Sequence, residues 1–105
     1  MLNLVVLIGT VAADPVERNL PDGDSAMEYR IQAANEGKRT LPLPATASRK
    51  ALGREYAAAK KVRKGDTVAL DGRLERRFYR SGAGARSLTE VVVAHITTVG
   101  ASEEA

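Results

Sequence analysis

The stretch from Asp71 to Val92 carries residue types that suit contact with a nucleic-acid strand. It holds five arginines, the adjacent rings of Phe78 and Tyr79, and a glycine-rich break near residue 83. Guanidinium groups pair with phosphates and flat rings stack on bases, and each stacked base contributes roughly 1–3 kcal/mol. The plainer interpretation is a solvated hairpin. We therefore carry both hypotheses, a surface for a negatively charged polymer and an ordinary polar hairpin.

Alternation along an extended strand divides the first half of this stretch into two faces. One face is predicted to contact the core, although Arg76 must point out of the core near its end. This face holds Val68, Leu70, Gly72, Leu74, Arg76 and Phe78. The other face is a row of positive charge with one phenol ring: Arg73, Glu75, Arg77 and Tyr79. Tyr79 is thus the candidate for stacking, and Arg80 and Arg86 extend the cationic track around the glycines.

The charge of the chain is unevenly distributed. The net charge is only +3, but residues 1–37 carry six acidic and two basic residues. Residues 49–64 carry seven basic residues and one acidic residue, and residues 73–86 carry five and one. Such asymmetry favours a nucleic-acid or acidic-surface partner. A basic helix end that is merely solvated, or that stabilises the helix macrodipole, is the alternative for the first basic segment.

No residues form a pattern typical of catalysis. The chain has no cysteine, which excludes disulfides and thiolate zinc sites. His95 is the only histidine and has no ligand cluster around it in the sequence. The glycines of residues 82–86 lack the lysine and the following helix of a phosphate-binding loop. We expect a protein without enzymatic activity, cofactor or metal.

Five segments are predicted to be strands. The apolar run at residues 4–8 predicts a strand covered on both faces, which Asp14-Pro15 ends or bends. A turn at residues 20–24 precedes a half-buried strand in which Met27, Tyr29 and Ile31 alternate with polar residues. Residues 41–46 contain two prolines and predict an edge strand or an extended segment. Two strands of a hairpin follow, at residues 68–78 and 88–99.

One helix is predicted, over residues 48–62. Ser48 suits the N-cap, and Gly65 suits the stop after the last turn. An apolar stripe marks the buried side: Leu52, Tyr56, Ala59 and Val62. The rings of Tyr29 and Tyr56 are therefore predicted to lie in the core.

This order of elements predicts an all-β fold. Five strands with a helix between the third and the fourth are typical of the OB-fold, a five-stranded Greek-key barrel that binds oligonucleotides. We expect one domain over residues 1–100 and a short disordered C-terminus at residues 101–105. No apolar run approaches a membrane span, and the apolar N-terminus is short for a signal peptide. A cytoplasmic protein associated with the nucleoid is expected.

Three segments together resemble the bacterial single-stranded DNA-binding protein family. They are LNLVVLIGTVAADPVER, YRIQAAN and VRKGDTVALDGRLERRFYRSGAGARSLTEVVV, and the resemblance runs from Asn3 to about Val99. It implies an OB-fold that binds single-stranded DNA without sequence preference in replication, recombination or repair. It also implies a homo-oligomer, with a tetramer favoured and a dimer as the alternative.

The resemblance also implies site residues. Arg18 follows the Asp-Pro motif, Arg63 and Lys64 stand at the helix end, and Arg77 and Tyr79 take the places of a cation and a stacking ring. With the basic residues of the strands, the helix and the loop at residues 35–40, the predicted nucleic-acid-binding set is Arg18, Arg30, Lys38, Arg39, Arg49, Arg63, Lys64, Arg73, Arg77, Tyr79, Arg80 and Arg86.

The sequence departs from the family in three respects. It has no tryptophan, and Leu41 stands where the family usually has an aromatic residue. The loop before it is short, and the family's long tail, which recruits replication proteins, has no counterpart. We expect weaker and more electrostatic binding than in a typical member. The alternatives are a replication-complex interaction module similar to primosomal replication protein N, and an RNA-binding module.

Overall fold

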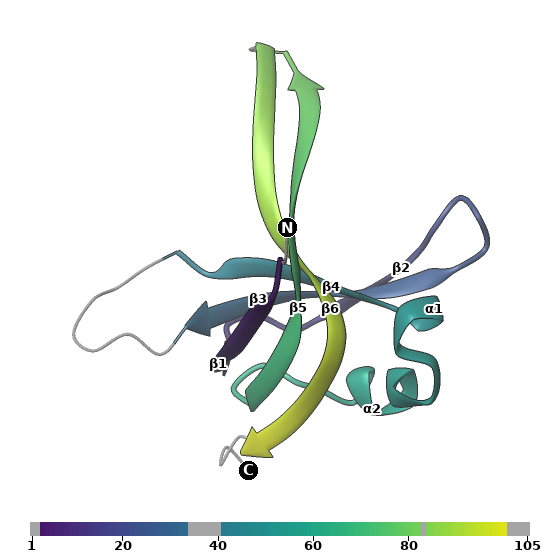
Figure 1. Cartoon of the computed structure of the whole chain (residues 1–105), viewed down its shortest axis with the longest axis vertical. Helices are drawn as coiled ribbons and strands as arrows, with labels where there is room; N and C mark the ends of the chain where they lie inside the picture. The colour runs from purple at the N-terminus through teal and green to yellow at the C-terminus, as the bar shows by residue number, and fades with distance from the viewer. Residues whose placement is uncertain (1–2, 34–40, 83, 101–105) are drawn as a thin grey trace.

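The computed structural model describes residues 3–33, 41–82 and 84–100. The described part is mostly β-structure with one short helical region (Figure 1). In chain order, the elements are β1 (Val5–Val11), β2 (Val16–Asn19), β3 (Ser25–Ala33), β4 (Leu43–Ser48), α1 (Arg49–Leu52), the 3₁₀ turn η1 (Gly53–Glu55), α2 (Tyr56–Ala59), β5 (Thr67–Ser81) and β6 (Gly84–Gly100). None of the described helices has the length and apolar character needed to cross a membrane.

The strands form a ring. Their order is β1-β5-β6-β4-β3-β2, and β1 also pairs with β3, which brings the two sides of the sheet together. All pairings are antiparallel except that of β4 with β6, which joins Ala45 to Val91 and Thr46 to Val92. The prediction of a mostly β fold with a single helical region is confirmed.

The predicted bend at Asp14-Pro15 accounts for one more strand than expected. β1 ends at Val11 and pairs with the end of β3 at Ile31, whereas β2 begins at Val16 and pairs with the start of β3 at Glu28. Two separate strands, one on either side of the bend, thus pair with different parts of β3. The helical region therefore lies between the fourth and fifth strands, and the prediction that it lies between the third and fourth was wrong.

The core fills the ring and is closed by the helix. Tyr29, Ile31, Val11, Val68, Val91 and Val93 are fully buried, as alternation predicted for β3 and for the ring part of β5. The helix stripe is buried as well, at Leu52, Tyr56, Ala59 and Val62. The hydroxyl of Tyr29 donates to the carbonyl of Ala59 at 2.5 Å, which ties β3 to α2 and satisfies a buried polar group.

The helical region is shorter and less regular than predicted. Ser48 is the N-cap, and its hydroxyl accepts from the amide of Ala51 at 3.1 Å. Gly53 then adopts φ +57°, which an α-helix does not use, and this ends α1 after one turn. The stop also comes before residue 62: α2 ends at Ala59, and the amide of Gly65 bonds instead to the carbonyl of Val11 at 2.9 Å.

β4 is an interior strand of the ring, so of the two alternatives predicted for residues 41–46 the edge strand was wrong. It pairs with β3 along its length and with β6 at two residues. The parallel pairing with β6 begins at Ala45, immediately after Pro44, so the proline lies outside this short ladder. An interior strand can therefore contain this proline, although the residue has no N–H to donate to a neighbouring strand.

β1 is covered on one face only, which contradicts the expectation that both faces would be buried. Val5 and Leu7 pack against the core, whereas Leu4, Val6 and Ile8 are 61%, 72% and 56% exposed. The apolar run therefore supplies an outer apolar face that no other part of this chain covers among the described residues.

The hairpin of β5 and β6 projects from the ring as an arm (Figure 1). We define the arm as the paired segments Leu74–Ser81 and Gly84–Val91. A register shift between Asp71 and Gly72 marks its base. A Cβ at Gly72 would lie 2.0 Å from the carbonyl oxygen of Val92. The two strands therefore approach each other there too closely for any residue that has a side chain.

The predicted core face of β5 fails in the arm. Val68 and Leu70 are buried, but Leu74 is partly exposed and Phe78 is 74% exposed. The alternation continues, but the arm lies beyond the ring and has no packed layer against this face. The prediction that Phe78 lies in the core was therefore wrong.

Candidate nucleic-acid interface

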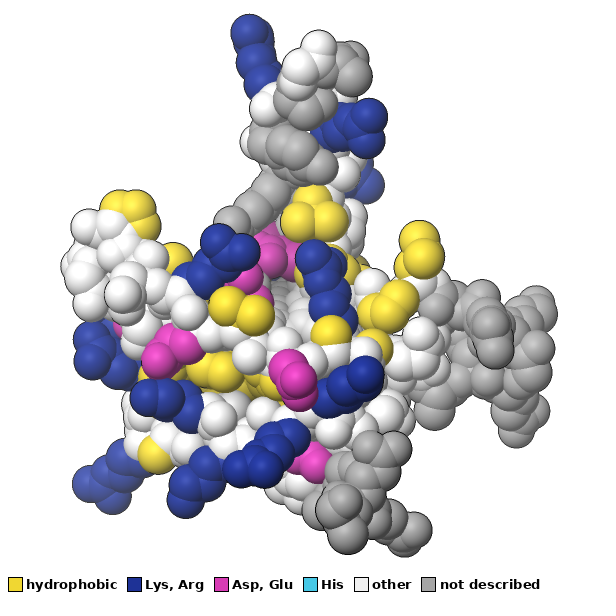
Figure 2. All heavy atoms as spheres, turned by 180° about the vertical axis from the view of Figure 1, so that it is seen from behind, with side chains coloured by type: hydrophobic (Ala, Val, Ile, Leu, Met, Phe, Trp, Pro, Cys, Tyr) yellow, Lys and Arg dark blue, Asp and Glu magenta, His cyan; other side chains and the backbone are white. Residues whose placement is uncertain are grey.

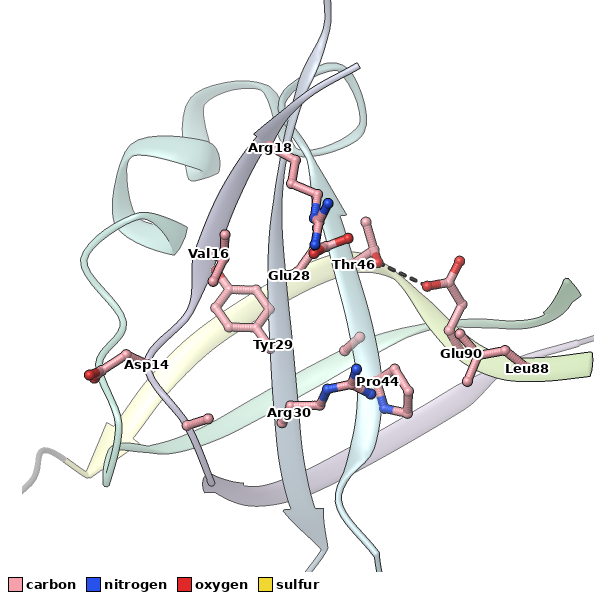
Figure 3. A pocket seen from close by; sticks show the side chains of 12 residues that line it. Asp14, Val16, Arg18, Glu28, Tyr29, Arg30, Pro44, Thr46, Leu88 and Glu90 are labelled. Atoms are coloured by element: carbon pink, nitrogen blue, oxygen red, sulfur yellow. Dashed lines mark hydrogen bonds and ion pairs between the residues drawn. The ribbon is translucent and has the colours of Figure 1, made fainter. Parts of the chain in front are cut away.

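A groove of about 340 Å³ crosses the outer surface of the ring at the foot of the arm. Register places Val16 beside Glu28 and Glu28 beside Thr46, so one row of side chains spans β2, β3 and β4. Residues from β6 complete it at the side of the arm. The side chains labelled in Figure 3 line the groove: Asp14, Val16, Arg18, Glu28, Tyr29, Arg30, Pro44, Thr46, Leu88 and Glu90.

Two predicted contact residues, Arg18 and Arg30, line this groove. They come from the neighbouring strands β2 and β3, and both are exposed. The Nε of Arg18 donates to a carboxylate oxygen of Glu28, while Arg30 lies on the other side of Glu28, beside Pro44 (Figure 3). Since the Arg18 side chain is 65% exposed, its pairing with Glu28 leaves it accessible to a phosphate.

The floor of the groove is acidic, which the sequence reasoning missed. Glu90 is 4% exposed, and one of its carboxylate oxygens accepts from the hydroxyl of Thr46 at 3.0 Å. Figure 2 shows acidic side chains in the hollow at the foot of the arm, with basic side chains on both sides. The alternation of Glu28 with buried Met27 and Tyr29 was the signal that assigned Glu28 to this outer face.

The arm carries further cations on both of its faces. Arg80 and Arg86, both predicted contacts, are exposed on its two strands, and exposed Arg76 adds a cation outside the predicted set. The backbone register pairs Arg77 with Leu88 and Tyr79 with Arg86. The side chains of Arg77 and Tyr79 lie outside the described part of the structure.

Other predicted cations lie away from the groove. Arg49 pairs with Asp24 at 3.8 Å and lines a separate cleft beside the helix. Arg63 and Lys64 are exposed between α2 and β5. Arg73 donates to Glu75 at 2.6 Å and lines a depression near the start of β1. Lys38 and Arg39 lie outside the described residues.

The cleft beside the helix is partly neutralised. The hydroxyl of Tyr56 donates to a carboxylate oxygen of Glu17 at 2.7 Å, and this bond lowers the pKa of Glu17. The ammonium of Lys60 lies 3.6 Å from the same oxygen and acts in the same direction. Burial raises the pKa values of Tyr29 and Tyr56, whose rings are enclosed in the core and unavailable for stacking, as predicted.

An exposed pair of polar side chains joins β5 and β6 on the ring. The Nδ1 of His95 lies 2.8 Å from a carboxylate oxygen of Asp71 on the exposed side of β5 and β6. The hydrogen bond to Asp71 raises the pKa of His95. Within residues 3–33, 41–82 and 84–100, histidines and carboxylates nowhere gather into a group of three that could hold a metal ion.

Comparison with known proteins agrees with this geometry. No curated protein matches the chain. The model of the single-strand binding protein family matches residues 2–99, nearly the whole chain. Members of this family have the OB-fold, bind single-stranded DNA in replication and repair, and catalyse no reaction. The chain therefore belongs to the single-strand binding protein family, and it binds single-stranded DNA.

Proposed function

We propose that residues 1–100 form one closed OB-fold barrel that holds single-stranded DNA in the groove and along the arm, without sequence preference. The observation that carries the proposal is that Arg18 and Arg30 line one groove and that Arg86 lies on the groove face of the arm that rises from it. Cations along a groove that continues onto a projecting hairpin suit an extended polyanion. The strand would be protected and kept free of secondary structure.

The acidic floor suggests how the strand lies. Carboxylates at Glu28 and Glu90 repel phosphates from the centre of the groove. Phosphates would therefore run along the margins, where Arg18 and Arg30 lie, and bases would lie toward the floor and the arm. Tyr79 would stack on one of these bases.

A homo-oligomer, tetramer or dimer, is supported by the outer face of β1. Leu4, Val6 and Ile8 present three large apolar side chains at alternate positions to solvent. A second copy of the chain would remove this apolar face from water. Val6→Lys should lower the molar mass measured by light scattering. An unchanged mass would show that copies associate elsewhere or that the chain is a monomer.

Binding is tested by fluorescence anisotropy with labelled oligo-dT, its duplex and oligo-rU across a salt series. Wild type should prefer oligo-dT, with affinity that falls steeply with salt. Equal and weak binding to all three would leave only a basic surface and favour an interaction module, and preference for oligo-rU would favour RNA. Action on DNA within the cell would place the protein in the cytoplasm, at the nucleoid.

Variants separate the two kinds of contact. Arg30→Ala should weaken oligo-dT binding and reduce the salt slope by about 0.7, the change for one phosphate contact on a single strand. Tyr79→Ala should weaken binding without changing the slope, because the ring carries no charge. Arg54→Ala removes an exposed arginine that does not line the groove and is the matched control. Equal effects of Arg30→Ala and Arg54→Ala would reject the groove.

A further inference from the structure

Phe78 is a large ring that the fold leaves in solvent. It is the only phenylalanine of the chain and is 74% exposed, in the middle of the β5 strand of the arm. Its cross-strand partner is Ser87, which offers no apolar cover. Burying a ring of this size is favourable, so a ligand that covered Phe78 would gain binding free energy.

The ring faces away from the groove. Leu88 and Glu90 of β6 line the groove, and side chains alternate along a strand, so Ser87 and Thr89 lie on the opposite face of the arm. Cross-strand partners share a face, and the partners of Ser87 and Thr89 are Phe78 and Arg76. The Phe78 face is therefore distinct from the groove face.

Two arginines flank the ring on this same face. Arg76 and Arg80 stand two residues before and after Phe78, about 6.7 Å along the strand on each side, and both are exposed. Within the described part of the chain, neither arginine has a carboxylate at ion-pair distance, in contrast to Arg18 and Arg73. A ring between two such cations is complementary to a base between two phosphates.

We propose that Arg76, Phe78 and Arg80 form a second binding site for single-stranded DNA, in which a base stacks on Phe78 and its neighbouring phosphates pair with the two arginines. The proposal rests on the proposed function, because it extends the DNA path from the groove face of the arm to the other face. It adds a stacking ring in a chain that has no tryptophan.

The first test is spectroscopic. Phe78→Trp introduces the single tryptophan of the chain, and stacking of a base on it should quench its fluorescence when oligo-dT is added. Ala58→Trp places the same reporter on exposed helix surface as a matched control and should respond little. Quenching of both reporters alike, or of neither, would overturn the proposal.

The second test is affinity. Phe78→Ala should weaken oligo-dT binding roughly five- to a hundred-fold, the range for one stacked base, with the salt slope unchanged. Its circular dichroism and melting temperature should match wild type, because the ring is exposed. Affinity within two-fold of wild type would overturn the proposal. A change in molar mass by light scattering would also overturn it, since Phe78 would then pack against a second copy.

The outcomes for the two proposals are distinguishable. If wild type does not bind oligo-dT, the proposed function fails and this inference fails with it. If wild type binds and Arg30→Ala weakens binding while Phe78→Ala does not, only the second site fails.

Discussion

The ring and the arm are built from the same two strands and differ in what covers them. In the ring, β5 buries Val68 completely, whereas ten residues later, on the same side of the strand, Phe78 is 74% exposed. Alternation decides which side chains share a face, and it does so equally in both regions. Whether a face is buried from solvent depends on a second layer of structure packed against it, which the ring has and the arm lacks. The ring therefore supplies stability, and the arm offers side chains for contact.

The largest contrast is expected between core and arm substitutions. Ile31→Ala should lower the free energy of unfolding by about 2–5 kcal/mol, because Ile31 is fully buried and the change leaves a cavity. Phe78→Ala should change it by less than about 0.5 kcal/mol. Denaturant unfolding at one fixed protein concentration measures both. A Phe78→Ala cost close to that of Ile31→Ala would show that the arm is packed.

The junction between the regions is sensitive to one methyl group. Gly72→Ala should lower the free energy of unfolding by about 1–3 kcal/mol, because the new Cβ meets the Val92 backbone. Gly82→Ala at the tip of the arm is the matched control, since nothing lies within 4 Å of its added Cβ. Thermal unfolding of the two variants side by side checks this, and similar melting temperatures would contradict the close crossing.

A serine-to-alanine substitution should lower the free energy of unfolding more at the helix cap than in the arm. Ser48→Ala removes the hydroxyl that accepts from the Ala51 amide and should cost about 1 kcal/mol of unfolding free energy. Ser87→Ala on the exposed face of the arm should cost almost nothing. The denaturant concentrations at the unfolding midpoints of both variants test this prediction, and equal midpoints would contradict it.

The smallest effect concerns the outer face of the ring. Asp71→Asn should lower the pKa of His95 toward its ordinary value of about 6.5, because the carboxylate raises it. A pKa raised by folding stabilises the folded state below the ordinary value, and this contribution is lost as pH rises through the folded pKa. Proton NMR titration of the only histidine measures the shift. An unchanged pKa would show that the pair does not form.

Much of the local structure was predictable because it depends on neighbours in the sequence. The cap at Ser48, the helix stripe, the turn at residues 20–24 and the alternation of β3 were all predicted correctly. Each depends on residue types within a few positions. The break at Gly53 and the split of the first strand into β1 and β2 were harder, because one residue's φ and one bend decide them.

Part of the candidate site was predictable and part was not. Arg18 and Arg30 were proposed as contacts, and both line the groove. The acidic floor was missed, because Glu28 and Glu90 are 62 residues apart and meet only through the pairing of β3, β4 and β6. Arg49 was proposed for its charge and Arg73 for its place on the charged face of its strand, and the fold gives both of them carboxylate partners away from the groove.

The sequence by itself determined where most of the strands lie, which side chains share a face, and that cations and rings follow the last hairpin. These features depend on local periodicity and residue type, which the chain carries before it folds. Only the tertiary structure decided which faces are covered: it left one face of β1 and the ring of Phe78 exposed and placed β4 inside the ring of strands. The reason is that burial depends on a second layer formed by distant segments, and no local pattern specifies where that layer ends.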